Sequence, residues 1–197
     1  MNNIKNICVF SSSSNFLDEN FYYDAKLMGK LIGKNGYNIV YGGSTLGMMW
    51  SCACEVKNNG GKIYGVMPQK LVDMGCRTDN CDEFYLTSGM RERKGKMDEI
   101  SDAVIALAGG FGTLEELTEM IVQKQLGYNK KPIVLLNTLG FYDKLVEFFD
   151  NMTEKKFANE YSKTLYYVAN TPQEAIEYLN NYVEPSGVIS KHQIYSR

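Results

Sequence analysis

The sequence has 197 residues, 44% of them hydrophobic, which suits one medium-sized domain with a substantial core. Its net charge of −2 makes no general case for binding polymeric nucleic acid or an acidic membrane surface, and no apolar run approaches the roughly 20 residues of a membrane span. The N-terminal segment lacks the apolar stretch of a signal peptide, and the five cysteines are irregularly spaced, so we expect reduced thiols in a cytoplasmic protein. We expect one domain at residues 1–183 and a polar tail at residues 184–197.

Short apolar runs and helical periodicities alternate along the chain. Strands are expected at residues 4–10, 37–41, 62–66, 83–87, 103–107, 133–137 and 165–168. Helices are expected at residues 19–35, 46–58, 90–101, 141–151 and 172–182, with one more opening after Gly112. Residues 69–82 are expected to form a loop with some helix, and Pro68 is expected to stop the third strand. The alternation predicts an α/β fold with a doubly wound, mostly parallel sheet and helices on both faces, although the strand order is not readable.

Two turns that follow the first strands are candidate ligand contacts. The first strand ends in four serines, and Ser12 is a candidate because hydroxyl-rich turns often lie beside ligands, although serine also simply favours turns. The second strand is followed by Gly42, Gly43 and Gly47 at the start of a helix. In open α/β sheets the ligand lies outside the carboxyl ends of the strands, so these turns are expected to share one crevice.

A basic segment begins the helix at residues 90–101. It carries Arg91, Arg93 and Lys94 after Met90. Cations at the start of a helix oppose the helix dipole, so a ligand or a partner carboxylate should offset them. A solvated basic helix is the plainer alternative.

The segment at residues 102–120 predicts a strand, a glycine loop and a helix. The loop contains Gly109, Gly110 and Gly112 and is closed by Thr113. Glycines let the backbone approach an anion closely, and the first N–H groups of a helix are unpaired at the positive end of its dipole. We therefore expect the loop to cradle a phosphate, with a tight strand-to-helix turn as the alternative. The carboxylates of Glu115 and Glu116 lie one turn into the helix, where they can reach past a phosphate to the rest of a ligand.

Metal binding and histidine-based catalysis are not expected. The single histidine, His192, lies in the polar tail, and Cys52 and Cys54 lie two residues apart on a helix and so face different directions. Without a Ser-His-Asp or Cys-His set, catalysis must use carboxylates, Arg, Lys, hydroxyls or backbone N–H groups.

Three segments together resemble the LOG (Lonely Guy) family of cytokinin riboside 5′-monophosphate phosphoribohydrolases, over about residues 4–182. The family's glycine motif PGGxGTxxE is matched by Gly109, Gly110, Gly112, Thr113 and Glu116. Its basic motif MHERK is matched by Met90, Glu92, Arg93 and Lys94, and its YGGGxxGLM motif by Tyr41, Gly42, Gly43, Gly47 and Met48. Two positions depart from the family: Ala108 replaces Pro, which affects loop geometry, and Arg91 replaces His, which puts base preference or dimer contacts in question.

The resemblance implies a Rossmann-like homodimer that hydrolyses the N-glycosidic bond of a nucleoside 5′-monophosphate to a free base and ribose 5-phosphate. It implies that Arg93 and Glu116 are the catalytic pair and that no cofactor or metal is required. Glu116, expected to face solvent, would stabilise positive charge on the sugar and orient water. Glu115 would bind the ribose hydroxyls, although the two glutamates could exchange roles. Substrate contacts are predicted at Ser12, Gly42, Gly43, Met90, Lys94, Gly109, Gly110, Gly112, Thr113 and Glu115, with Lys94 alternatively a local ion pair.

Two other classes of protein are possible readings of the same residues. A non-catalytic nucleotide or cofactor carrier needs the glycine cradle but not the Arg and Glu pair. A structural or partner-binding protein explains neither glycine turn. Met48, Met49 and Trp50 add modest support for a dimer interface, but they serve equally well as core residues.

Overall fold

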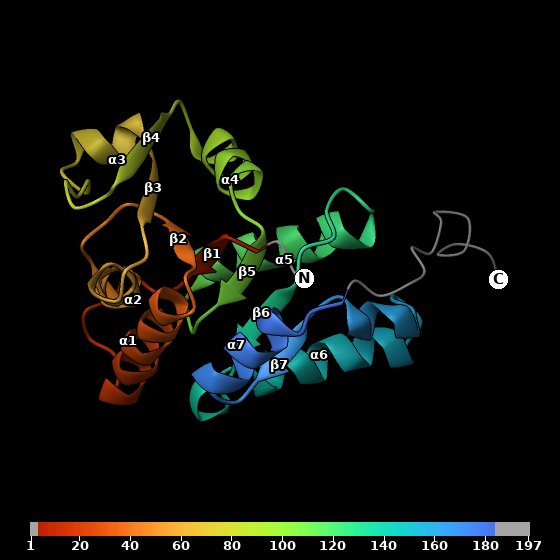
Figure 1. The fold of residues 1–197 in the computed structure, drawn as a ribbon. Coiled ribbons are helices and arrows are strands. Elements are labelled where there is room, and N and C mark those ends of the chain that lie inside the picture. The colour runs from red at the N-terminus through yellow and green to blue at the C-terminus, as the bar shows by residue number, and fades with distance from the viewer. Residues whose placement is uncertain (1–3, 184–197) are drawn as a thin grey trace.

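The computed structural model describes residues 4–183, which form a seven-stranded sheet flanked by helices (Figure 1). The strands are β1 (Asn6–Phe10), β2 (Asn38–Tyr41), β3 (Ile63–Pro68), β4 (Glu83–Thr87), β5 (Ala103–Ala106), β6 (Ile133–Leu136) and β7 (Tyr167–Ala169). The helices are α1 (Glu19–Lys34), α2 (Gly47–Asn58), α3 (Gln69–Asp73), α4 (Met90–Glu99), α5 (Phe111–Gln125), α6 (Asp143–Glu154) and α7 (Pro172–Asn180), with short 3-10 segments η1 (Thr138–Gly140) and η2 (Glu160–Thr164). The predicted tail and His192 lie outside the described residues.

The strand order of the sheet is β4-β3-β2-β1-β5-β6-β7, and every described strand pair is parallel. The chain winds outward from β1 through β2, β3 and β4, and then returns to place β5 on the other side of β1. The α/β, doubly wound prediction is confirmed, and the order, which the sequence did not reveal, puts the topological switch point between β1 and β5. A crevice for a ligand forms at such a point, at the carboxyl ends of the two strands.

Side chains of each strand alternate between two cores. Ile7 and Val9 of β1 pack with α1, α2 and α7, whereas Cys8 and Phe10 pack with α4, α5 and α6. Both faces of the sheet are therefore covered, as a parallel sheet requires, and the strands are apolar almost throughout. None of the helices within residues 4–183 combines the length and apolar character needed to cross a bilayer.

The predicted third strand is wrong at its end, because β3 continues through Pro68 instead of stopping before it. Pro68 pairs in register with Thr87 of β4, but β2 pairs with β3 only as far as Gly65. The missing N–H of Pro68 therefore costs no hydrogen bond on the β2 side. The helix expected at residues 141–151 instead begins at Asp143 and ends at Glu154, and η2 was not expected at all.

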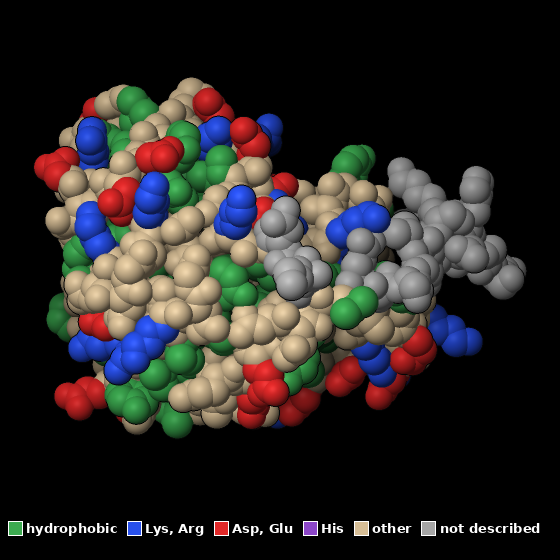
Figure 2. Space-filling model, viewed as in Figure 1, with side chains coloured by type: hydrophobic (Ala, Val, Ile, Leu, Met, Phe, Trp, Pro, Cys, Tyr) green, Lys and Arg blue, Asp and Glu red, His purple; other side chains and the backbone are tan. Residues whose placement is uncertain are grey.

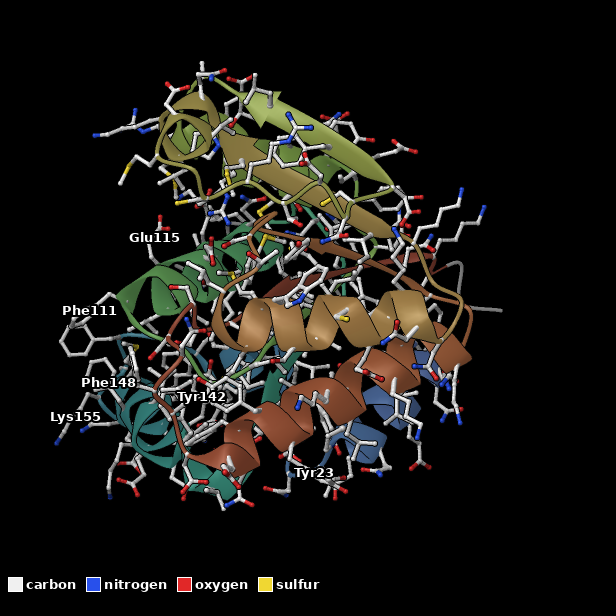
Figure 3. The ribbon with its side chains drawn as sticks, turned by 90° about the vertical axis from the view of Figure 1, so that its left-hand side faces the viewer. Tyr23, Phe111, Glu115, Tyr142, Phe148 and Lys155 are labelled. Atoms are coloured by element: carbon white, nitrogen blue, oxygen red, sulfur yellow. The ribbon has the colours of Figure 1, made fainter. Side chains whose placement is uncertain are left out.

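Helices α1 and α2 lie side by side (Figures 1 and 3), and Gly29 makes this close approach possible. A Cβ atom built at Gly29 would lie 2.1 Å from the backbone oxygen of Cys52, and backbone cannot swing aside as a side chain does. The contact holds α2 in place, and the glycine turn that leads into α2 is one of the turns predicted from sequence to contact a ligand.

We expect Gly29→Ala to destabilise the protein by about 1–3 kcal/mol through overpacking. In a helix without this contact the same change stabilises, because alanine favours helix over glycine by roughly 1 kcal/mol. Gly95→Ala in α4 is the matched control, since a Cβ there meets nothing within 4 Å. Urea unfolding of the two variants measures the difference, and equal stabilities would contradict the packing role of Gly29.

Candidate active site

The turns predicted to share a crevice are joined directly. The backbone N–H of Ser12, after β1, donates to the carbonyl of Ala108 after β5 at 3.2 Å, and the N–H of Met49 in α2 donates to the Ser12 carbonyl at 3.4 Å. Beside this junction lies a hollow of about 260 Å³. It is lined by Ser12, Leu17, Phe21, Ala108, Gly109, Gly110 and Phe141. The switch point of the sheet is therefore bounded by the serine turn and the second glycine loop.

Helix α5 begins at this crevice with its N-terminus uncapped. Gly110 is the N-cap residue and no side chain accepts from the first N–H groups, as is also the case at α2, α3, α4 and α6, whereas Asp18 and Thr171 cap α1 and α7. The side chain of Thr113 is buried against the loop, so closely that a Cβ at Gly109 would lie 2.1 Å from its Oγ1 atom. A Cβ at Gly110 or Gly112 meets nothing within 4 Å. The loop thus presents unpaired helix N–H groups to open space, which is the arrangement that binds a phosphate.

Arg93 of α4 and Glu116 of α5 form an ion pair beside the glycine loop. The Arg93 Nη1 atom lies 2.8 Å from the Glu116 Oε1 atom, and each side chain is only 11% exposed. The Arg93 Nε group also donates to the backbone carbonyl of Val66 in β3 at 3.1 Å. The Glu116 carboxylate thus offsets the Arg93 cation, which lies at the start of α4, where positive charge opposes the helix dipole.

Only 11% of the Glu116 side chain is exposed, so the expectation that it faces solvent is wrong. Burial raises the pKa of its carboxyl above the ordinary value of 4.5, more than the neighbouring Arg93 guanidinium lowers it. A carboxylate whose pKa is raised by burial and which lies beside a cation is typical of catalytic sites. Because the ionised form is poorly solvated, it gains more from positive charge that develops nearby than an exposed carboxylate would.

A second ionic contact joins the same two helices. The Lys94 ammonium of α4 bonds both Glu115 and Glu119, which lie one turn apart on α5. These hydrogen bonds raise the pKa of Lys94. Glu115 remains 58% exposed and projects from the first turns of α5, as does Phe111 (Figure 3). Lys94 therefore clamps α4 against α5, which holds Arg93 opposite Glu116.

The remaining predicted residues lie around this pair. The carbonyl of Gly43 accepts from the N–H of Thr78, and Gly42 lies against the Arg93 guanidinium. Met90, the first residue of α4, is exposed. Val66 and Glu119 were missed from sequence. Val66 acts through its backbone carbonyl, which leaves no signal in the sequence, whereas Glu119 lies four residues after Glu115 and helical spacing places both beside one cation.

Within residues 4–183 no group of three or more His, Cys, Asp or Glu side chains is placed to hold a metal ion. All five cysteines are free thiols, and Cys8 and Cys52 are buried. The site chemistry of the described residues thus consists of a guanidinium, carboxylates, hydroxyls and backbone N–H groups.

Comparison with known proteins identifies the family. A family model described as "possible lysine decarboxylase" matches residues 49–179. The chain is 38% identical over 179 residues to a probable cytokinin riboside 5′-monophosphate phosphoribohydrolase of Oryza sativa subsp. japonica, covering 90% of this chain and 73% of the relative. It is 36% identical over 182 residues to a cytokinin riboside 5′-monophosphate phosphoribohydrolase of Arabidopsis thaliana, covering 91% and 84%. The chain belongs to the LOG family.

Solved structures share the fold of this LOG protein. The Moco carrier protein of Chlamydomonas reinhardtii is 25% identical, with a TM-score of 0.69 over 90% of this chain and 96% of that one. The molybdenum cofactor binding protein of Rippkaea orientalis is 24% identical, with a TM-score of 0.67 over 90% and 94%.

We expect the stability of the LOG protein to depend on the ionisation of Glu116. Folding raises the pKa of this carboxyl, so its contribution to stability is fully present below the unfolded value and is lost as the pH rises through the folded value. Glu116→Gln does not titrate, and its amide oxygen can still accept from Arg93. Urea unfolding from acidic to neutral pH should show the unmodified protein losing stability relative to this variant. A stability difference that does not change with pH would contradict the raised pKa.

Proposed function

We propose that this LOG protein hydrolyses the N-glycosidic bond of a nucleoside 5′-monophosphate, releasing the free base and ribose 5-phosphate. The observation that carries the proposal is the buried ion pair of Arg93 and Glu116, held 2.8 Å apart beside the uncapped start of α5. One helix thus offers both an anion site at its first turn and a carboxylate one turn later. That separation suits a ribose with a phosphate at one end and a reacting carbon near the other.

The reaction builds positive charge on the ribose as the bond between C1′ and the base nitrogen breaks. The electron pair of that bond leaves with the base, and an oxygen of water forms a new bond to C1′ while a proton goes to the base. The Glu116 carboxylate stabilises the cationic sugar and orients the water. Arg93 holds Glu116 in position and stabilises the departing base. Activity should therefore require ionised Glu116.

Other residues hold the substrate in this mechanism. The backbone of Gly109 to Gly112, with Thr113, receives the 5′-phosphate, and Ser12 closes the far side of the loop. Glu115 binds the ribose hydroxyls, and exchange of its role with Glu116 is disfavoured because Glu115 is exposed and already paired with Lys94. Lys94 acts through its two carboxylate partners.

The base is that of a cytokinin riboside monophosphate or AMP. The relatives of Oryza sativa and Arabidopsis thaliana named above carry the first of these in their names. The two departures from the family motifs leave the pair intact: Ala108 is buried before the loop, and Arg91 is exposed on α4. Arg91 is therefore placed to affect the base or a partner rather than the bond that breaks.

A cofactor carrier is the second candidate, because the solved structures that share the fold include the Moco carrier protein of Chlamydomonas reinhardtii. A carrier uses the glycine loop but has no need of a buried cation and carboxylate. The Arg93–Glu116 pair and the higher identity to the phosphoribohydrolases favour the enzyme.

We expect the protein to release adenine from AMP and Glu116→Gln to lower kcat by about 100-fold or more, since general base and electrostatic contributions have this size. Affinity for AMP should be retained, because backbone N–H groups bind the phosphate. Glu115→Gln is the matched control on the neighbouring residue, and it should raise KM more than it lowers kcat. Chromatography of the free adenine released at several AMP concentrations measures kcat and KM for both variants. Tight AMP binding without base release by the unmodified protein would favour the carrier.

We also propose that the protein is a homodimer, that its other partner is a small-molecule nucleotide, and that it is located in the cytoplasm. Met48 is buried in the core and Met49 and Trp50 pack against it, so these residues give no support to an interface. Support comes from α5 and α6, where an apolar hollow of about 240 Å³ lies between the helices. It is lined mainly by Thr118, Ile121, Val122, Phe149, Met152, Leu165 and Tyr166. On the face visible in Figure 2, Lys and Arg are interspersed with Asp and Glu, so this face offers no single-sign patch for polymeric nucleic acid or an acidic membrane.

We expect Val122→Glu and Phe148→Glu to convert the dimer into monomers. Both side chains are exposed hydrophobic residues of α5 and α6, and a charge buried in an interface is costly. Tyr23→Glu, at an exposed position of α1, is the control and should leave the dimer intact. Analytical ultracentrifugation of the three variants gives the molecular mass. A monomeric unmodified protein at micromolar concentration would refute the dimer.

A further inference from the structure

Gly42 differs from the other glycines of its turn. Gly43 and Gly47 have φ values of +73° and +59°, in the left-handed region where a side chain is strained. Gly42 is not among the residues with positive φ. Its φ therefore does not exclude a side chain, and the effect of adding one depends on its surroundings.

The space where a side chain would stand at Gly42 is filled by Arg93. A Cβ atom at Gly42 would lie 2.7 Å from the Arg93 Nη2 atom and 3.9 Å from Cζ, whereas ordinary contact begins near 3.4 Å. Met49 Sδ, at 3.4 Å, would be in ordinary contact. The single severe clash is thus with the end of the guanidinium.

The guanidinium cannot shift at this end without losing its other contacts. Its Nε group donates to the Val66 carbonyl at 3.1 Å, and its Nη1 group bonds Glu116 at 2.8 Å. The group is planar and rigid, so a push on Nη2 turns both of the other nitrogens. The Arg93 guanidinium therefore has a close neighbour at each of its three nitrogens, namely Gly42, Val66 and Glu116.

We infer that Gly42 is a positioning residue, whose missing side chain lets Arg93 reach Glu116. It acts through Arg93 and need not touch the substrate. The kinetic part of this inference rests on the proposed phosphoribohydrolase activity, whereas the geometric part does not. A side chain at residue 42 leaves the strands and helices in place and moves only the guanidinium, because the clash falls on the end of a flexible side chain.

The test compares Gly42→Ala with Gly95→Ala in the full-length protein. Gly95 lies in α4, two residues after Arg93, and a Cβ there meets nothing within 4 Å. For Gly42→Ala we expect kcat on AMP to fall by about 100-fold with little change in KM, because a displacement of about 1 Å has this effect. Carbon-13 NMR should show the pKa of Glu116 rising above that of the unmodified protein, since Arg93 lowers it. Gly95→Ala should change neither quantity.

The NMR titration separates this inference from the proposed function, since it needs no turnover. A shifted Glu116 pKa in a protein that releases no base leaves the positioning role standing and refutes the activity. Unchanged kcat and unchanged pKa in Gly42→Ala refute the positioning role while the activity stands. If Gly42→Ala does not fold, adding Arg93→Lys removes the clashing atom and should restore folding. A double variant that still does not fold would overturn the inference.

Discussion

The buried contact between Arg93 and Glu116 is the constraint that orders the candidate site. Each residue comes from a different helix on the same face of the sheet. The contact therefore exists only if β3, α4 and α5 are correctly placed relative to one another. The fold provides two supports for it. The backbone carbonyl of Val66 in β3 accepts a hydrogen bond from Arg93, and Lys94 forms ion pairs with Glu115 and Glu119 of α5. These supports matter because the cost of desolvating the two charges offsets much of the attraction between them.

The position of the pair follows from the winding of the chain. Outward winding from β1 to β4 and return to β5 leave one crevice, and the glycine loop after β5 opens into it. The uncapped N-terminus of α5 then supplies an anion site, and the next turn supplies Glu116. In the proposed mechanism, phosphate binding and charge stabilisation are thus two consequences of one strand-loop-helix unit.

Much of this was predictable from sequence. Apolar runs located the seven strands of the described residues. The cations at the start of α4 indicated that a ligand or a partner carboxylate should offset them, and the structure shows a carboxylate beside Arg93. The wrong predictions concern properties that are set by residues distant in the sequence. Pro68 stays in β3 because β2 has already ended, and Glu116 is buried because α4 covers it. Gly42 looked like its neighbours in sequence, and only the location of the Arg93 guanidinium distinguishes it.

The most direct test of this account is a crystal structure of Glu116→Gln with AMP, in which the substrate should persist. The account predicts the phosphate at the first N–H groups of α5, between Gly110 and Thr113, and C1′ beside residue 116 with the Arg93 guanidinium within reach of the base. A nucleotide bound elsewhere, with the glycine loop packed against protein, would contradict it. So would a phosphate in the loop whose ribose points away from residue 116, since the carboxylate could not then stabilise the charge that forms at C1′.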